Sequence, residues 1–354
     1  MKVLLSLRSD ALKVFGGDTV YTQKIAEVVR KRGVTVVLSD EHPPKLRDID
    51  LVNVINVVNL SEVTRTVERA KAQGIPVILT PEYYNLDRFF LHTHWKANVA
   101  RLTLGESAGL ALFRLKKQLS HPWKALRKLM QEVDHVVAKS EREKRQLIVD
   151  FDLPASKISI VPNGVDPRFG SGASPTAFTK RYGIKDFLLT VGRVEPIKNQ
   201  LSLLKATRGL DIPLVFIGGG YTASNTYLDE CRKLARGRPV HFIDRLPHDE
   251  MAGALAAARA HVAPSYNETT SLVSLEAILC GCPVVVTKES PYAEYFGSDV
   301  LTCDPYDVAS IRAAVEKILK RPPPVAKIRQ RLIREFTWER IGRELAKVYQ
   351  EVAK

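Results

Sequence analysis

The sequence predicts an α/β protein built from two successive parallel sheets with helices on both faces. Short apolar segments alternate with helix-like segments along all 354 residues, as expected for repeated βαβ units. The series of strands is too long for one sheet of ordinary size. A stretch rich in proline, glycine and serine at 167–175 interrupts the series and is therefore the best candidate for a linker.

The first strand of the first half is the buried apolar run Lys2–Leu7. This run is too short for a signal peptide, and charge returns at Arg8. Helices such as Tyr21–Lys31 and Val63–Ala72 are expected between the strands. The remaining strands expected in this half are Val34–Leu38, Val52–Val57, Val77–Leu79, His135–Val137 and Ile158–Val161.

The second half repeats the pattern, with helices such as Val308–Leu319, and ends in an amphipathic helix at 338–354. We expect an N-terminal domain at 1–166, a C-terminal domain at 167–337 and the final helix at 338–354. Thr337 is a suitable N-cap for that helix. The strands expected here are Phe187–Val191, Leu214–Ile217, Val240–Ile243, Ala260–Ala263, Val284–Val286 and Val300–Leu301.

Composition and charge narrow the class of protein. Apolar residues make up 45% of the chain, which suits packed domains and argues against disorder. The net charge of +14 favours anionic partners such as nucleotides or phospholipids, but no recognition motif for nucleic acid accompanies it. No segment approaches the ~20 apolar residues of a membrane span. The four cysteines form no zinc-type pair, so reduced thiols in a cytosolic protein are expected.

The segment 264–286 carries two carboxylates, Glu268 and Glu276, with seven residues between them. Pro264 ends an apolar strand, the polar residues up to Ser271 form a loop, and an apolar helical face follows. A polar loop is therefore expected between a strand's carboxyl end and a helix N-terminus. Ligands bind at such places in open α/β sheets, and helix N-termini favour anions.

This segment resembles the E-x7-E motif of retaining GT-B glycosyltransferases, specifically glycosyltransferase family 4, also described as glycosyl transferases group 1. By that resemblance, Glu268 contacts the donor sugar and Glu276 the nucleotide ribose. The amides of Thr270, Ser271 and Leu272 would face the donor diphosphate. The resemblance implies the GT-B fold, in which two Rossmann-like parallel-sheet domains face a cleft and the final helix packs back on the N-terminal domain.

The segment 192–199 resembles the family's G-R-x4-K-N segment. By that resemblance, Arg193 and Lys198 grip the donor diphosphate, which gains negative charge as the glycosidic bond breaks. Fixed cations stabilise such charge. The family generally needs no metal, and no cofactor other than the donor is implied. The resemblance makes Glu268, Lys198 and Arg193 the residues expected to act in catalysis.

Two further segments are expected to line the nucleotide pocket. Gly218 and Gly219 follow a strand and allow close approach of a ligand to the backbone. The segment with Arg245 and Leu246 resembles the one that holds the base through backbone groups. Asp244 stands where the family commonly has glycine, so UDP and GDP both stay open as donors.

In the first half, Gly16 and Gly17 precede a helix, and the family places a glycine-rich loop there at the donor. A histidine that the family often carries after the strand at 77–79 is absent. Glu82 stands in its neighbourhood and is a candidate for contact with the sugar or acceptor. His92 and His94, further along, are candidates on the acceptor side, although a lone histidine is more often structural.

Cations alternate with aromatic and aliphatic residues over 113–130. Such a segment suits an anionic membrane surface. It equally suits an ordinary pair of amphipathic helices, broken at Pro122 and packed on the sheet. The resemblance to a family with many lipid-linked acceptors favours the membrane slightly.

The resemblance implies a retaining hexosyltransferase that uses a UDP- or GDP-linked sugar and a glycan or lipid-linked glycan acceptor, without metal. The expected location is cytoplasmic, either free or peripheral on the inner face of the membrane. Same-face displacement and a covalent intermediate both stay open. The alternatives are a degenerate GT-B protein that binds a glycan or partner without catalysis, and a GT-B nucleotide-sugar epimerase.

Overall fold

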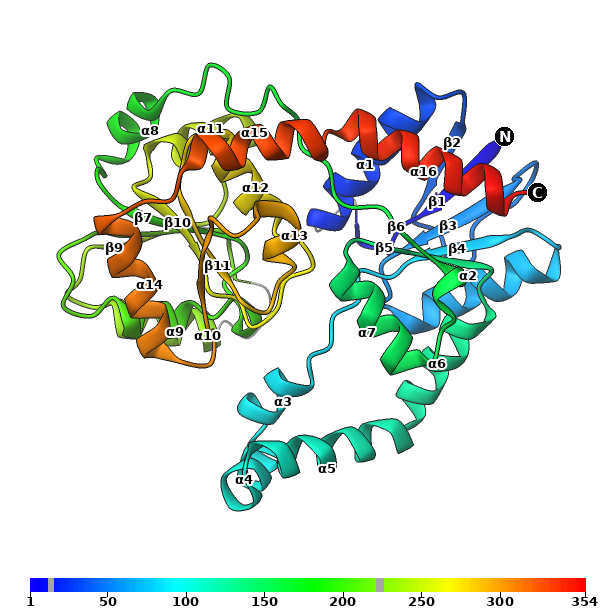
Figure 1. Cartoon of the computed structure of the whole chain (residues 1–354), viewed down its shortest axis with the longest axis horizontal. Helices are drawn as coiled ribbons and strands as arrows, with labels where there is room; N and C mark the ends of the chain where they lie inside the picture. The colour runs from blue at the N-terminus through cyan, green and yellow to red at the C-terminus, as the bar shows by residue number, and fades with distance from the viewer. Residues whose placement is uncertain (12–15, 221–225) are drawn as a thin grey trace. The chain divides into compact units, whose positions relative to one another are not determined.

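The computed structural model describes residues 1–11, 16–220 and 226–354. The chain divides into two compact units, which are shown in Figure 1 and described separately below. Unit 1 comprises Met1–Gly164 and Trp338–Lys354, and unit 2 comprises Val165–Thr337.

The sheet of unit 1 is fully parallel, with strand order β2-β1-β3-β4-β5-β6. Its interior strands are buried on both faces, which explains their continuous apolar sequences. Each segment expected as a strand overlaps an observed strand, so the parallel α/β prediction is confirmed. The strands are β1 (Lys2–Ser6), β2 (Thr35–Ser39), β3 (Leu51–Ile55), β4 (Val77–Thr80), β5 (His135–Ala138) and β6 (Ile158–Ile160).

The helices of unit 1 include a group that the sequence reading did not separate, α3 to α5. Figure 1 shows α3, α4 and much of α5 standing away from the sheet of this unit. Pro122 lies in the first turn of α6, so the chain breaks between α5 and α6 as expected at that proline. The helices are α1 (Gly17–Arg30), α2 (Leu60–Ala72), α3 (Asp87–Thr93), α4 (Trp95–Leu104), α5 (Glu106–Leu119), α6 (His121–Glu132), α7 (Glu141–Phe151) and α16 (Trp338–Val352).

The C-terminal helix α16 packs on α1 and reaches the sheet of unit 1. A Cβ atom added to Gly342 would lie 2.5 Å from a methyl carbon of Val28, so the two helices touch at a glycine. The Asn53 amide on β3 donates to the Tyr349 hydroxyl at 2.8 Å. This contact joins residues almost 300 positions apart, so unit 1 includes the helix α16.

The sheet of unit 2 is also parallel, with order β12-β11-β10-β7-β8-β9. Its strands are β7 (Leu188–Val191), β8 (Leu214–Ile217), β9 (Val240–Ile243), β10 (Ala260–Ala263), β11 (Val284–Thr287) and β12 (Leu301–Cys303). The direction of winding reverses between β7 and β10. Ligands bind at such switch points, outside the carboxyl ends of the strands.

Helices cover both faces of this second sheet, and a separate apolar core fills each side. The longest of them, α14, lies near the expected position. The helices are α8 (Pro175–Tyr182), α9 (Gln200–Ala206), α10 (Thr226–Ala235), α11 (His248–Ala257), α12 (Leu272–Leu279), α13 (Tyr292–Phe296), α14 (Val308–Lys320) and α15 (Val325–Glu335). Across the parts of the chain described above, no helix combines the length and apolar character needed to cross a bilayer.

Candidate active site

The loop after β7 carries both predicted phosphate-binding cations of unit 2. Pro196–Lys198 forms a 3-10 turn, and Asn199 follows in the left-handed conformation with φ 59°. The buried Asn199 amide donates to Pro264 O at 3.1 Å and to Pro305 O at 2.8 Å. Asn199 therefore ties the β7 loop to the loops after β10 and β12, and it fixes where the neighbouring Lys198 stands.

Lys198 and Glu268 meet at the switch point between β7 and β10. The ammonium of Lys198 lies 2.7 Å from Oε1 of Glu268, and the Ser265 hydroxyl donates to the same oxygen at 2.7 Å. The two loops are also joined by a backbone bond of 2.8 Å from Tyr266 N to Ile197 O. The side chains of Lys198 and Glu268 keep 26% and 12% of their surface exposed. An ion pair that is held in place yet reachable by solvent can also be reached by a ligand.

Arg193 is the second cation of this loop. Its guanidinium lies 3.1 Å from the Glu195 carboxylate and is 47% exposed, whereas Glu195 is 11% exposed. The Gln200 amide donates to Arg193 O at 2.9 Å, which anchors the backbone beside α9. The anchored backbone and the exposed head group together suit binding of an anion from solvent.

Gly218 stands where the loops after β7 and β8 touch. A Cβ atom at this position would lie 2.2 Å from Gly192 O, and the residue has φ 137°. Gly219 is different, because the nearest atom that its added Cβ would meet among the described residues is Asp244 O at 3.8 Å. Gly218 is thus required by backbone packing, whereas Gly219 leaves room beside the site.

The first turn of α12 follows Glu268 closely. Ser271 precedes the helix with φ 58°, and its hydroxyl lies 2.7 Å from that of Ser274. The buried Thr270 hydroxyl donates to the Tyr295 hydroxyl at 3.3 Å. Leu272 is the first residue of the helix, and Glu276 lies one turn further on, partly exposed. The structure therefore places Thr270, Ser271 and Leu272 at a helix N-terminus, as the sequence predicts.

Arg245 and Leu246 follow β9. Arg245 is exposed, and the Leu246 side chain is buried in the core of unit 2. Only the backbone of Leu246 is therefore available to a ligand, and the role of this segment at the base stays a prediction.

His261 on β10 is a residue that the sequence reading passed over. Its ring is buried, its Nδ1 lies 3.1 Å from Leu189 O, and its Nε2 has no partner among the described residues. Burial lowers the pKa of His261 to about 4, with a smaller lowering by the Lys198 charge and smaller raising effects of the Leu189 hydrogen bond and of Glu268. His261 is therefore a neutral imidazole near the ion pair. The only signal in the sequence is a histidine inside an apolar strand.

In unit 1, the predicted glycine loop brings Asp18 against Arg8. Asp18 Oδ2 accepts from Arg8 Nε at 2.7 Å and from Asn56 Nδ2 at 3.4 Å. Gly16 precedes α1 in an extended conformation, and Gly17 is the first residue of α1. Phe15, which belongs to the same predicted loop, lies outside the described residues. The carboxyl ends of β1 and β3 thus carry a charged group next to the two glycines.

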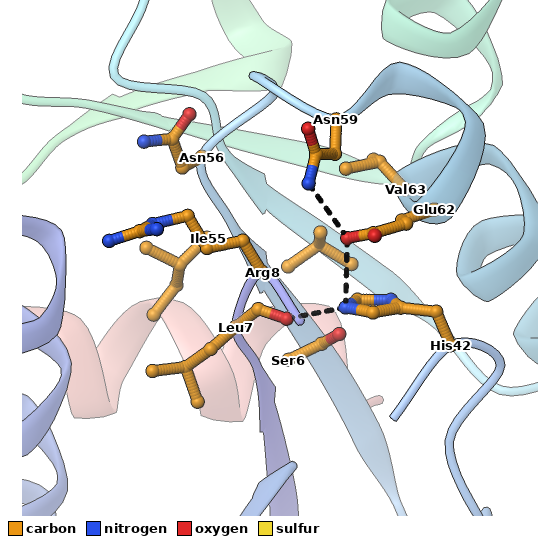
Figure 2. A pocket seen from close by; sticks show the side chains of 10 residues that line it. Ser6, Leu7, Arg8, His42, Ile55, Asn56, Asn59, Glu62 and Val63 are labelled. Carbon is orange, nitrogen blue, oxygen red and sulfur yellow. Dashed lines mark hydrogen bonds and ion pairs between the residues drawn. The ribbon is translucent and has the colours of Figure 1, made fainter. Parts of the chain in front are cut away.

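A small pocket lies beside this group, at the switch point between β1 and β3. Figure 2 shows Arg8, Asn56, Asn59, Glu62 and His42 around it. The His42 ring lies 2.6 Å from Leu7 O and 3.5 Å from Glu62.

Glu62 is the acidic group of this pocket. Burial alone would raise the pKa of Glu62, but hydrogen bonds from Ser9 and Asn59 outweigh burial and hold the pKa below its usual value. Glu62 is therefore a fixed carboxylate among hydrogen-bond donors.

Glu82 belongs to a group of charges at the carboxyl ends of β4 and β5. It follows β4 with φ 51°, and it interacts electrostatically with the fully buried Lys139, which follows β5. The Lys139 ammonium lies 2.9 Å from the centroid of the Tyr21 ring. Glu143 accepts from the backbone amides of Lys139 and Tyr83, each at 2.7 Å.

Burial dominates the protonation of this group. It raises the pKa of Glu82 and of Glu143 and lowers the pKa of Lys139, because each charged form loses hydration. Lys139 is not among the candidate residues of the sequence analysis, since a lysine after a strand carries no signal of its own.

His92 and His94 lie on a different part of unit 1. His92 is in α3, 3.5 Å from Glu106, and burial lowers its pKa. His94 follows α3, is exposed and contacts the Phe90 ring. Figure 1 shows α3 away from the sheet of unit 1, so these two histidines do not join Glu82 within this unit. Their acceptor-side role stays a prediction.

Comparison with known proteins identifies the family. The sequence model described as Glycosyl transferases group 1 matches residues 177–335, and the model described as Glycosyltransferase Family 4 matches residues 15–169. The chain therefore belongs to the group 1 glycosyl transferases of family 4, as its motifs predict.

A curated relative agrees with this assignment. Glycogen synthase of Mycobacterium tuberculosis is 29% identical over 231 residues, which cover 62% of this chain and 55% of the relative. The chain thus spans little more than half of that protein.

Sucrose-phosphate synthase from Thermosynechococcus elongatus matches with TM-score 0.78 at 15% identity, over 99% of this chain and 98% of that one. Anabaena HepE in complex with UDP-glucose matches with TM-score 0.74 at 16% identity, over 99% and 100%. The fold is therefore GT-B.

Proposed function

We propose that this protein is a retaining glycosyltransferase that moves a hexose from a UDP- or GDP-linked sugar to a glycan or lipid-linked glycan. The observation that carries the proposal is the contact between Lys198 and Glu268 at the switch point of unit 2, with Arg193 on the same loop. The two cations can bind a diphosphate, and the carboxylate beside them can bind the hydroxyls of the attached sugar.

Each donor-side residue has a distinct task in this proposal. Lys198 and Arg193 bind the diphosphate and stabilise the charge that develops on it as the leaving group departs. The amides at the start of α12 add hydrogen-bond donors at a helix N-terminus. Because two side-chain cations serve the diphosphate, we propose that transfer needs no metal ion.

Glu268 positions the sugar, and Glu276 binds the ribose. When the diphosphate binds Lys198, the Glu268 carboxylate loses part of its ion-pair partner and gains the sugar hydroxyls as hydrogen-bond donors. A fixed carboxylate beside the anomeric carbon also stabilises an oxocarbenium-like transition state. The leaving phosphate can take the proton of the acceptor hydroxyl on the same face.

Gly16 and Gly17 are donor-side residues in this proposal and allow close approach of the donor beside Asp18. The other residues of unit 1 supply the acceptor side. Glu82 is held with a raised pKa beside Lys139, and a protonated or shared carboxyl can both donate to and accept from a sugar hydroxyl. Glu82 therefore replaces the hydrogen-bonding capacity of the histidine that the family often carries after β4.

The test of donor binding is thermal unfolding with UDP, GDP, ADP or buffer, first with a chelator and then with magnesium. A nucleotide at about 100 times its Kd adds about 2.7 kcal/mol to the free energy of unfolding. HepE is in complex with UDP-glucose in its solved structure, so a shift with UDP is expected first. The Lys198→Met variant should lose the shift. An unchanged melting temperature with every nucleotide contradicts the proposed donor site.

The retaining mechanism is tested by the anomeric configuration of the product. An α-linked nucleotide sugar should yield an α-linked product, which nuclear magnetic resonance distinguishes from a β-linked one. A β-linked product would contradict retention, and interconversion of the donor without transfer would identify an epimerase.

A further inference from the structure

Helices α4 and α5 leave several large apolar side chains in contact with solvent. Their exposed fractions run from 36% to 69%. A single exposed leucine is common on a protein surface, but several exposed apolar residues on two packed helices are a candidate interaction site. The group, which we call the α4–α5 surface, consists of Val99, Leu102, Leu104, Leu112, Leu115 and Leu119.

The helical geometry of α5 explains why its three exposed leucines lie together. Leu112, Leu115 and Leu119 are three and four residues apart, so they share one face of the helix. The opposite face is packed, because Arg114 and Lys117 lie there and pair with the buried Asp87 of α3. The leucine face therefore points away from the helices that support α5.

The same region holds much of the positive charge of the chain. Residues 88–128 contain nine lysines and arginines and a single acidic residue, Glu106. Lys116 lies beside the leucine face of α5, and Lys124 is exposed on α6. Arg114 and Lys117 pair with the buried Asp87 and so hold α5 against α3.

Only part of the segment 113–130, which the sequence analysis proposed as a membrane-binding segment, is exposed. Trp123, Leu129 and Met130 on α6 are buried in the core of unit 1, and Trp123 stacks on Phe151. The apolar residues of α6 are thus an ordinary packed helix face. Leu115 and Leu119 on α5 remain exposed, and so do Val99, Leu102 and Leu104 on α4.

We propose that the α4–α5 surface docks on an anionic phospholipid membrane. The leucines would enter the boundary of the acyl chains while the neighbouring lysines meet the lipid phosphates. A lipid surface satisfies both groups at once. A protein partner would bury the lysines in a type of interface where lysine is depleted, and nucleic acid would leave the leucines in water.

Vesicle flotation of the full chain, without donor or acceptor, tests the proposal. The protein should float with vesicles that contain phosphatidylglycerol, float weakly with phosphatidylcholine alone, and bind less in high salt. The triple variant Leu102→Gln/Leu115→Gln/Leu119→Gln should lower the partition coefficient by about 100-fold or more. Val149→Gln, at an 81% exposed position on α7, is the matched control and should bind as the wild type does.

A second pair of variants tests how much the lysines contribute to vesicle binding. Lys116→Gln/Lys124→Gln should weaken binding to anionic vesicles by roughly fivefold for each lysine. Arg47→Gln, at a 94% exposed position, is the control and should change little. An equal loss for each charge removed in the two variants would mean that only net charge acts, which contradicts a defined docking surface.

Three further results would overturn the proposal: no flotation of the wild type, unchanged flotation of the triple variant, or a wild-type oligomer that the triple variant converts to a monomer. The last result would identify the surface as a contact between copies. Far-ultraviolet circular dichroism and the melting temperature show whether the variants are folded. Because flotation needs neither nucleotide nor transfer, its outcome is independent of the proposed activity.

Discussion

Replacing Gly218 by alanine should destabilise unit 2 strongly, whereas the same change at Gly219 should not. The new Cβ atom would lie 2.2 Å from Gly192 O and 2.6 Å from its carbonyl carbon. Because carbon contacts sit at about 3.5 Å, the loops after β7 and β8 must separate by about 1 Å. The residue also has φ 137°, a conformation that costs a side-chain-bearing residue about 1–3 kcal/mol.

Together, overpacking and backbone strain give an expected loss of about 3 kcal/mol or more in the free energy of unfolding. A unit of this size loses about 2–4 °C in melting temperature for each kcal/mol. Gly219→Ala is the control, since its Cβ would have 3.8 Å to Asp244 O, and it should change stability by less than about 1 kcal/mol.

Urea denaturation of the two glycine variants provides the measurement, and UDP titration of the same samples reports on the site. Gly218→Ala should also weaken UDP binding, because Gly192 precedes Arg193 and moves with it. Equal stability of the two variants would refute the reasoning, since the close contact at Gly192 would then be absent in solution.

Three further predictions concern other parts of the chain. Lys198→Met should lower the rate of sugar transfer by about 100-fold or more with little change in melting temperature, and near-normal transfer would exclude this lysine from catalysis. His261→Leu should flatten the dependence of the free energy of unfolding on pH between pH 6.5 and 4. In this range the unfolded histidine binds a proton and the folded one does not. The wild type should therefore lose about 3 kcal/mol through His261 as the pH falls across the range. Parallel urea-denaturation profiles of the two proteins would contradict this. Gly342→Ala should destabilise unit 1 by about 1–3 kcal/mol because its Cβ would lie 2.5 Å from a Val28 methyl carbon; a stabilised variant would show that α16 and α1 are not in close contact.

The sequence predicted the two parallel sheets because strand and helix periodicities are local properties. It also predicted that Arg193, Lys198 and Glu268 belong to a site, since each follows an apolar strand in a recognisable segment. The helices α3 and α4 were missed because short helices of mixed composition carry little periodic signal. The family assignment rested on spacing within single segments, such as Glu268 and Glu276, and the sequence models of the family confirm it.

Only the tertiary structure decided which distant groups meet. Lys198 pairs with Glu268, 70 positions away, because β7 and β10 are neighbours in the sheet. The sequences of the two segments do not predict that strand order. The same holds for Glu82 and Lys139, which approach each other because β4 pairs with β5. Tertiary packing likewise buried Trp123 and left Leu115 and Leu119 in solvent, although all three occur in one basic, apolar stretch. Composition sets what a segment can bury, and the neighbouring elements decide which face is covered.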